Sequence, residues 1–160
     1  MIIPKQRTRI QMIVIGFNLE TTGFRYTVLD GTKENPIFIE KQKVLKHGST
    51  NISELMDWYE TSFQNILDKF QPERIGIKFN LNGKKNQISL WYYPYGILHK
   101  LAYTKRIEVK EFLPANFTPS KFGLDKSITL DEYIDMKIGN HPPHWDKSQK
   151  ASVLSAWMVL

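Results

Sequence analysis

The sequence predicts an α/β domain: a mixed five-stranded sheet whose first three strands are antiparallel, flanked by helices. Two observations support this fold class. Three strand-like segments follow one another closely near the start, and helix-like and strand-like segments then alternate to the end of the chain. With 160 residues, of which 41% are hydrophobic and 12% aromatic, the chain has enough apolar material for one domain with its own core.

The three strands that come first are expected at residues 12–18, 23–30 and 36–45. The first is almost entirely apolar, which is typical of a strand buried on both faces of a sheet. Residues 19–22 are short and polar, so they are expected to form a turn, and Asp30-Gly31 marks a second turn. Strand, turn, strand, turn and strand in this order indicate an antiparallel meander.

The clearest helix is expected at residues 51–70. Asn51 followed by Glu54 three residues later resembles a capping box, and apolar residues then recur at helical spacing. Pro72 ends this pattern.

Strand and helix patterns alternate in the second half of the chain. Short strands are expected at residues 74–79 and 107–112, with a loop between 80 and 86 that contains Asn82-Gly83. Pro94 and Gly96 are expected to bend the helix at residues 88–103 or to delay its start. The remaining segments are a helix at 88–103, a turn or short helix at 114–123, a helix at 130–138, a loop at 139–143 and a closing helix at 147–160.

The positive charge of the chain is concentrated in its middle third. The formal net charge is +6, and residues 74–110 carry eight Lys and Arg against Glu108 alone, interleaved with aromatic residues. Basic groups neutralise phosphates and aromatic faces stack on unpaired bases, so this segment is a candidate nucleic-acid interface. A solvated basic face over core aromatics remains the alternative. The candidates are Lys78, Lys84, Lys85, Lys100, Lys105, Arg106, Tyr92 and Tyr93.

The chain contains no cysteine, which excludes disulfides, a thiol nucleophile and any cysteine-ligated metal site. No apolar stretch approaches the ~20 residues of a membrane-spanning helix. The apolar run at residues 12–17, although preceded by basic residues, is shorter than the core of a secretory signal. We therefore expect a cytoplasmic protein with no membrane partner.

Three motifs follow one another along the chain. Gly16-Phe17-Asn18 is followed by Gly23 and a second expected strand. The strand expected at residues 74–79 is followed by Gly83-Lys84-Lys85, and residues 149–156 are expected to form a closing helix of small residues. In this order, the three motifs resemble the RuvC-like (Holliday-junction resolvase-like) branch of the ribonuclease H-like superfamily. The chain is also similar to a bacterial family of short resolvase-like domains of unknown function. The resemblance implies a ribonuclease H-like domain over residues 12–160, with residues 1–11 as a basic N-terminal extension.

The resemblance also implies a place for two catalytic metal ions, and here this chain departs from the family. Two-metal hydrolysis of a phosphodiester needs carboxylates to hold the ions. The matching positions are Asn18, Lys78 or Phe79, Gln149 and Ser152, and none is a carboxylate. An ammonium group repels a metal ion. We expect Asn18, Lys78 and Ser152 to lie together at one end of the sheet, with no metal bound, no cofactor and no cleavage by this mechanism.

Weaker candidates for metal ligation remain elsewhere in the sequence. Glu20 could replace the missing carboxylate of Asn18, although an exposed acid in a turn is the expected role. His141, His144 and Asp146 form the densest cluster of ligand types. Asp146 is expected to cap the closing helix, and the two histidines to serve in packing.

Three functions follow from these observations. The first is a non-catalytic domain that binds DNA or RNA through the basic, aromatic middle segment. The second is a protein-interaction module, regulatory or inhibitory, with no nucleic-acid role. The third is a divergent metal-dependent nuclease that uses displaced acids.

Overall fold

The computed structural model describes residues 12–79 and 87–160, and its centre is one five-stranded sheet. The predicted basic extension at 1–11 and the loop that contains Lys84 and Lys85 lie outside the described residues. The strands lie in the order β3-β2-β1-β4-β5. Their bounds are β1 Val14–Glu20, β2 Gly23–Gly31, β3 Pro36–Leu45, β4 Arg74–Lys78 and β5 Glu108–Phe112.

The sheet is mixed, as the sequence predicts. β1, β2 and β3 pair antiparallel, whereas β4 runs parallel to β1, and β5 runs parallel to β4. The prediction of a turn at residues 19–22 is wrong for its first half, because Leu19 and Glu20 continue β1 and pair with Phe24 and Gly23. Leu19 is buried, so packing extends the strand past the point where its polarity suggests a turn.

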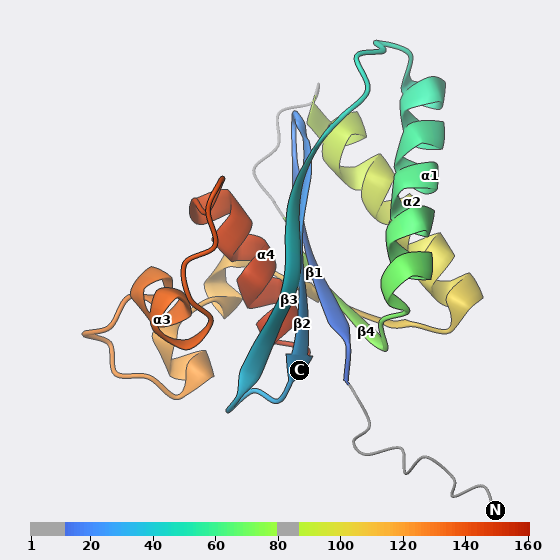
Figure 1. The fold of residues 1–160 in the computed structure, drawn as a ribbon. Coiled ribbons are helices and arrows are strands. Elements are labelled where there is room, and N and C mark those ends of the chain that lie inside the picture. The colour runs from blue at the N-terminus through green and yellow to red at the C-terminus, as the bar shows by residue number, and fades with distance from the viewer. Residues whose placement is uncertain (1–11, 80–86) are drawn as a thin grey trace, which may run out of the picture.

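Helices cover both faces of the sheet (Figure 1). α1 (Ile52–Phe70) and α2 (Ile88–Lys105) lie on one face, and α4 (Lys147–Trp157) lies on the other, with α3 (Leu130–Lys137) beyond it. Two short 3-10 helices, η2 (Pro114–Asn116) and η3 (Pro119–Phe122), occupy the segment predicted as a turn or short helix. No described helix is both long enough and apolar enough to span a membrane.

The helices can be compared with the sequence at the start of α1, inside α2 and at the end of α4. Asn51 caps α1, since its side chain accepts a hydrogen bond from the backbone N–H of Glu54. α2 continues through Pro94 as one helix, and α4 ends at Trp157, three residues before the predicted end. The bend or delay predicted from Pro94 and Gly96 does not divide α2, and Pro94 costs the helix the hydrogen bond that its missing N–H would donate.

The two faces of the sheet have different cores. The face under α1 and α2 is aromatic, and Phe24 lies 5.0 Å from Phe63 and 6.1 Å from Tyr59 between ring centroids. On the other face α4 lies against two glycines. A Cβ at Gly16 would overlap the backbone of Ser152 and Ala156, and a Cβ at Gly76 would overlap that of Ser155. Glycine is required at both positions by close approach of the helix backbone.

Candidate functional site

A pocket of about 510 Å³ lies where β1 and β4 end beside the starts of α2 and α4. We call it the edge pocket. Asn18 and Lys78 are register partners on the neighbouring parallel strands β1 and β4, so the sheet places them side by side. The lining residues are Asn18, Leu19, Glu20, Thr21, Lys78, Gln87, Trp91, Lys147 and Ser148.

Asn18 ties the end of β1 to the first turn of α4. Its side chain is only 4% exposed, and its Nδ2 donates hydrogen bonds to the backbone oxygen and to Oγ of Ser148, both at 3.0 Å. Its Oδ1 is buried and has no partner among the described residues. The position that the resemblance assigns to a metal-binding carboxylate is therefore occupied by an amide that serves as a structural hydrogen-bond donor.

Lys78 brings a positive charge to the same pocket. Burial lowers the pKa of its ammonium group, and the group forms no ion pair with any residue that the structure describes. The backbone oxygen of Lys78 accepts a hydrogen bond from the hydroxyl of the buried Tyr95. Lys147, the exposed first residue of α4, is a second cation in the lining. Because Lys78 itself lines the pocket, Phe79 does not take its place there.

The carboxylates nearest to the pocket are held by one buried arginine. The side chain of Arg25 is 5% exposed, its Nε lies 3.1 Å from Glu20, and its two terminal nitrogens contact the two oxygens of Asp146 at 3.0 and 3.1 Å. Glu20 also accepts a hydrogen bond from the hydroxyl of Ser148. The expectation of an exposed acid in a turn is therefore wrong for Glu20, which ends β1 and is 22% exposed.

Asp146 caps α4, as the sequence predicts. Its side chain accepts a hydrogen bond of 3.0 Å from the backbone N–H of Gln149. Burial raises the pKa of the Asp146 carboxyl, but the hydrogen bond from Gln149 and the guanidinium of Arg25 outweigh this effect and hold the pKa below its usual value. Asp146 thus stays an anion that anchors the start of α4.

Gln149 and Ser152 lie beneath the pocket rather than in it. Both are fully buried, and Gln149 donates to the backbone oxygen of Tyr26 at 2.9 Å and to Thr27 Oγ1 at 3.1 Å. Ser152 Oγ lies 2.7 Å from Thr27 Oγ1. Together these side chains form a polar cluster between β2 and α4. The predicted grouping of Asn18, Lys78 and Ser152 is therefore wrong for Ser152, which does not line the pocket that Asn18 and Lys78 share.

Ser148 takes the place predicted for Ser152. It lies one helical turn earlier on α4 and contacts Asn18 directly. Ser148 is not among the positions that the sequence matches to the family, which are Gln149 and Ser152. Residues four apart lie on the same face of a helix, so Ser148 follows the direction of Ser152 one turn nearer the helix start.

The two histidines have separate contacts. The ring of His141 stacks on Phe38 with 3.7 Å between ring centroids, and its Nε2 lies 2.9 Å from the backbone oxygen of Ile138. His144 is exposed, has φ of 60°, and offers its backbone oxygen to Arg25. Within residues 12–79 and 87–160, no three or more acidic or histidine side chains are grouped to hold a metal ion.

The basic and aromatic candidates of the middle third fall on separate surfaces. α2 is 18 residues long, which corresponds to about 27 Å, so its two ends cannot form one compact patch. Lys105, near its C-terminal end, lies 2.5 Å from Asp68, and Arg106 is the exposed residue that ends the helix. Lys78 belongs to the edge pocket, which adjoins the opposite end of α2.

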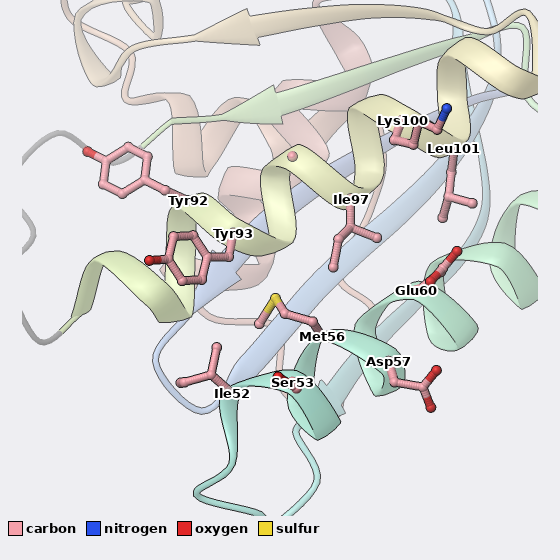
Figure 2. A pocket seen from close by; sticks show the side chains of 11 residues that line it. Ile52, Ser53, Met56, Asp57, Glu60, Tyr92, Tyr93, Ile97, Lys100 and Leu101 are labelled. Atoms are coloured by element: carbon pink, nitrogen blue, oxygen red, sulfur yellow. The ribbon is translucent and has the colours of Figure 1, made fainter.

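Lys100, Tyr92 and Tyr93 line a groove of about 770 Å³ between α1 and α2, shown in Figure 2. Met56 of α1 and Ile97 of α2 point toward one another across its floor. Tyr93 is 53% exposed on its wall, and the ring of Tyr92 packs on Phe79 at 5.1 Å between centroids. We call this the helix groove. Its charged residues are Asp57, Glu60 and Lys100.

Comparison with solved structures finds the same fold in Holliday junction resolvases. Thermus thermophilus RuvC in complex with a Holliday junction substrate matches with a TM-score of 0.74 at 14% sequence identity, over 92% of this chain and 91% of that one. The yeast mitochondrial Holliday junction resolvase matches with a TM-score of 0.68 at 14% identity, over 91% and 77%. The fowlpox virus Holliday junction resolvase matches with a TM-score of 0.53 at 14% identity, over 92% and 96%.

No protein-family model matches the chain. No curated protein matches it in sequence either. The structural likenesses establish a ribonuclease H-like, RuvC-like fold and confirm the fold predicted from the sequence. At these identities the likeness concerns the fold, and the site must be judged from its own residues.

Proposed function

We propose that this domain binds DNA or RNA and does not cleave it by the two-metal mechanism. The observation that carries the proposal is that the edge pocket presents lysines and an amide where the resemblance implies metal-binding carboxylates. Two lysines line it, an amide stands at the end of β1, and the nearby carboxylates Glu20 and Asp146 are engaged by Arg25.

A metal ion at this pocket would need carboxylate oxygens that are free to bind it. Glu20 would have to leave both Arg25 and Ser148, which would leave a buried guanidinium with a weakened set of partners. Arg25 would keep Asp146 but lose its second carboxylate, which is unfavourable for a guanidinium that is 5% exposed. The unpaired ammonium of Lys78 would repel the ion as well. The same lysine attracts a phosphate.

Binding is expected to be electrostatic and independent of base sequence, because lysine contacts to phosphates carry no sequence information. A filter-binding titration at increasing salt tests this. Retention of DNA or RNA at low salt that falls steeply as salt rises supports the proposal, with dissociation constants of about 10⁻⁴–10⁻⁶ M at physiological salt. No retention of either nucleic acid at low salt overturns it.

A divergent nuclease that uses Glu20 and Asp146 is the alternative that a cleavage assay decides. Incubation of labelled single-stranded, duplex and branched DNA with Mg²⁺ or Mn²⁺ should leave every substrate intact. Cleavage that disappears in Glu20→Gln would show that this carboxylate holds a metal after all, and the non-catalytic proposal would be wrong.

The helix groove favours a second candidate function, the binding of a protein segment. Its floor is apolar, and Asp57 and Glu60 on its rim form no ion pair with a described residue. The fitting occupant is a cationic amphipathic helix, with apolar residues on the floor and Lys or Arg at the rim. A Met56→Glu variant that loses a protein partner but retains nucleic acid would establish this function, and loss of neither would remove it.

A further inference from the structure

We propose that the edge pocket receives one unpaired nucleotide of a DNA or RNA strand, with its phosphate beside Lys78 and Lys147 and its base against Trp91. This inference rests on the proposed function. It adds one local binding site for a nucleotide to what would otherwise be diffuse attraction between a basic protein and a polyanion.

The charges of the lining support a phosphate. Lys78 and Lys147 come from different elements, the end of β4 and the start of α4, and neither forms an ion pair with a described residue. The one carboxylate of the lining, Glu20, lies 3.1 Å from the Nε of Arg25. The uncompensated charges of the lining are therefore both positive. A phosphodiester carries one negative charge and accepts hydrogen bonds from ammonium groups.

The start of α2 lies beside these lysines. The N-terminal end of a helix carries a partial positive charge, which favours an anion. Gln87 and Trp91 both belong to the lining, which places this end of α2 at the pocket.

Trp91 supports a base beside the phosphate. Trp91 is partly exposed, lines the pocket and also packs against the core under α1 and α2, and its buried Nε1 has no partner among the described residues. Because the polar atom of the indole is buried, the ring offers a carbon surface to the pocket. Bases stack on such surfaces whatever their identity, because each base has a π-face. A volume of about 510 Å³ is within the usual size of small-molecule sites.

The base must be unpaired to reach this ring. In a duplex both faces of a base are covered by its neighbours, so only a single strand or an extruded nucleotide can offer a face to Trp91. The proposal thus predicts a preference for single strands over duplex that diffuse electrostatics does not supply.

Tryptophan fluorescence of the whole protein tests this nucleotide site directly. Oligo-dT and oligo-rU of about eight nucleotides should quench the emission in a saturable way, and a hairpin duplex of equal length should quench it less. Trp91→Phe should remove most of the quench. Trp58→Phe is the matched control, since Trp58 packs on Phe24 away from the pocket and its loss should leave the quench in place.

Lysine variants test the phosphate in the same titration. Lys78→Met and Lys147→Met should each weaken binding and reduce the slope of log K against log salt by about one. Lys137→Met, which removes an exposed lysine at the end of α3, is the control and should act only weakly. If Trp91→Phe does not fold, Lys78→Glu and Lys147→Glu leave the indole in place and should abolish the quench.

The outcomes separate this inference from the proposed function. Single-strand affinity that is unchanged in the lysine variants, or a quench that survives Trp91→Phe, overturns this nucleotide site and leaves a nucleic-acid-binding domain. Equal affinity for duplex and single strand also overturns it. No binding of any nucleic acid overturns the proposed function itself. A preference for oligo-rU or oligo-dT identifies which strand the pocket accepts.

Discussion

The two faces of the sheet hold their helices by different means. Under α1 and α2, large rings such as Phe24 and Phe63 fill the space and leave the helices at a side-chain distance from the strands. Under α4, Gly16 and Gly76 bring the helix backbone onto the sheet, and buried polar groups such as Gln149 bond across the contact. Both faces bury apolar side chains, but only on the glycine face does the helix backbone itself lie against the strands.

This difference explains how the glycine face fixes the part of the edge pocket that comes from α4. Ser148 and Lys147 stand at the start of α4, so the depth of the helix on β1 decides whether they meet Asn18 and the pocket. A helix held by interchangeable rings would tolerate shifts of register. Backbone packed on glycine does not tolerate them, because any added Cβ must displace a backbone atom.

The largest loss of stability is expected from a substitution on the glycine face, the face where Gly16 and Gly76 contact α4. Gly16→Val should unfold the domain or destabilise it by more than about 4 kcal/mol, since its Cβ would overlap the backbone of Ser152 and Ala156. Urea unfolding followed by circular dichroism measures the change. Gly96→Ala is the control: no atom lies within 4 Å of its added Cβ, and it should stabilise α2 by up to about 1 kcal/mol. A fully stable Gly16→Val would contradict the account of α4.

A smaller loss is expected on the aromatic face. Phe63→Ala should cost about 3–5 kcal/mol, because a fully buried ring is replaced by a cavity. Under conditions where the variant remains folded, its affinity for nucleic acid should equal that of the wild type, since Phe63 does not line the edge pocket and the two lysines of the lining come from β4 and α4. Chemical denaturation together with filter binding tests both parts. Altered binding by the folded variant would show that the two faces are not independent.

A smaller effect still is expected at the cap of α4. Asn caps a helix about as well as Asp, so Asp146→Asn keeps the cap and removes only the charge that meets Arg25. Because the Asp146 side chain is 53% exposed, the loss should be only about 0.5–1 kcal/mol. Asp146→Ala removes the cap as well and should lose about 0.5–2 kcal/mol more. Equal stabilities of the two variants would contradict the capping role.

The pH dependence of the same pair follows from its lowered pKa. A carboxyl whose pKa is lower in the folded state stabilises the fold above its unfolded pKa, and this stability is lost as pH falls through the folded value. The difference in unfolding free energy between the wild type and Asp146→Asn should therefore be constant near neutral pH and shrink below about pH 4. A difference that grows on acidification would reverse the sign and refute the ion pair with Arg25.

The sheet could be predicted from the sequence because its signals are local or carried by a resemblance. Apolar runs mark the strands, Asn51 and Asp146 mark helix starts, and the order of elements indicates the fold. The site could be predicted only in part. Asn18 and Lys78 follow from strand order, because parallel neighbours end at the same edge.

Other site residues depend on contacts that no local pattern encodes. Arg25 reads as one polar residue in a strand, and nothing near it in the sequence points to Asp146, more than a hundred residues away. Ser148 and Ser152 satisfy the same helical pattern, and only the packing of α4 separates them. The basic stretch is continuous in sequence, but helix length divides it between the edge pocket, the helix groove and the far end of α2.

The most direct test of the central claim, that lysines rather than metal ions meet the nucleic acid at the edge pocket, is one binding titration under two conditions. The dissociation constant for a labelled single strand is measured in EDTA and in Mg²⁺ at matched ionic strength. The charges of Lys78 and Lys147 predict binding in EDTA that is not strengthened by Mg²⁺, and an intact strand in both conditions. Binding that requires Mg²⁺, or a strand that is cut when Mg²⁺ is present, would contradict it.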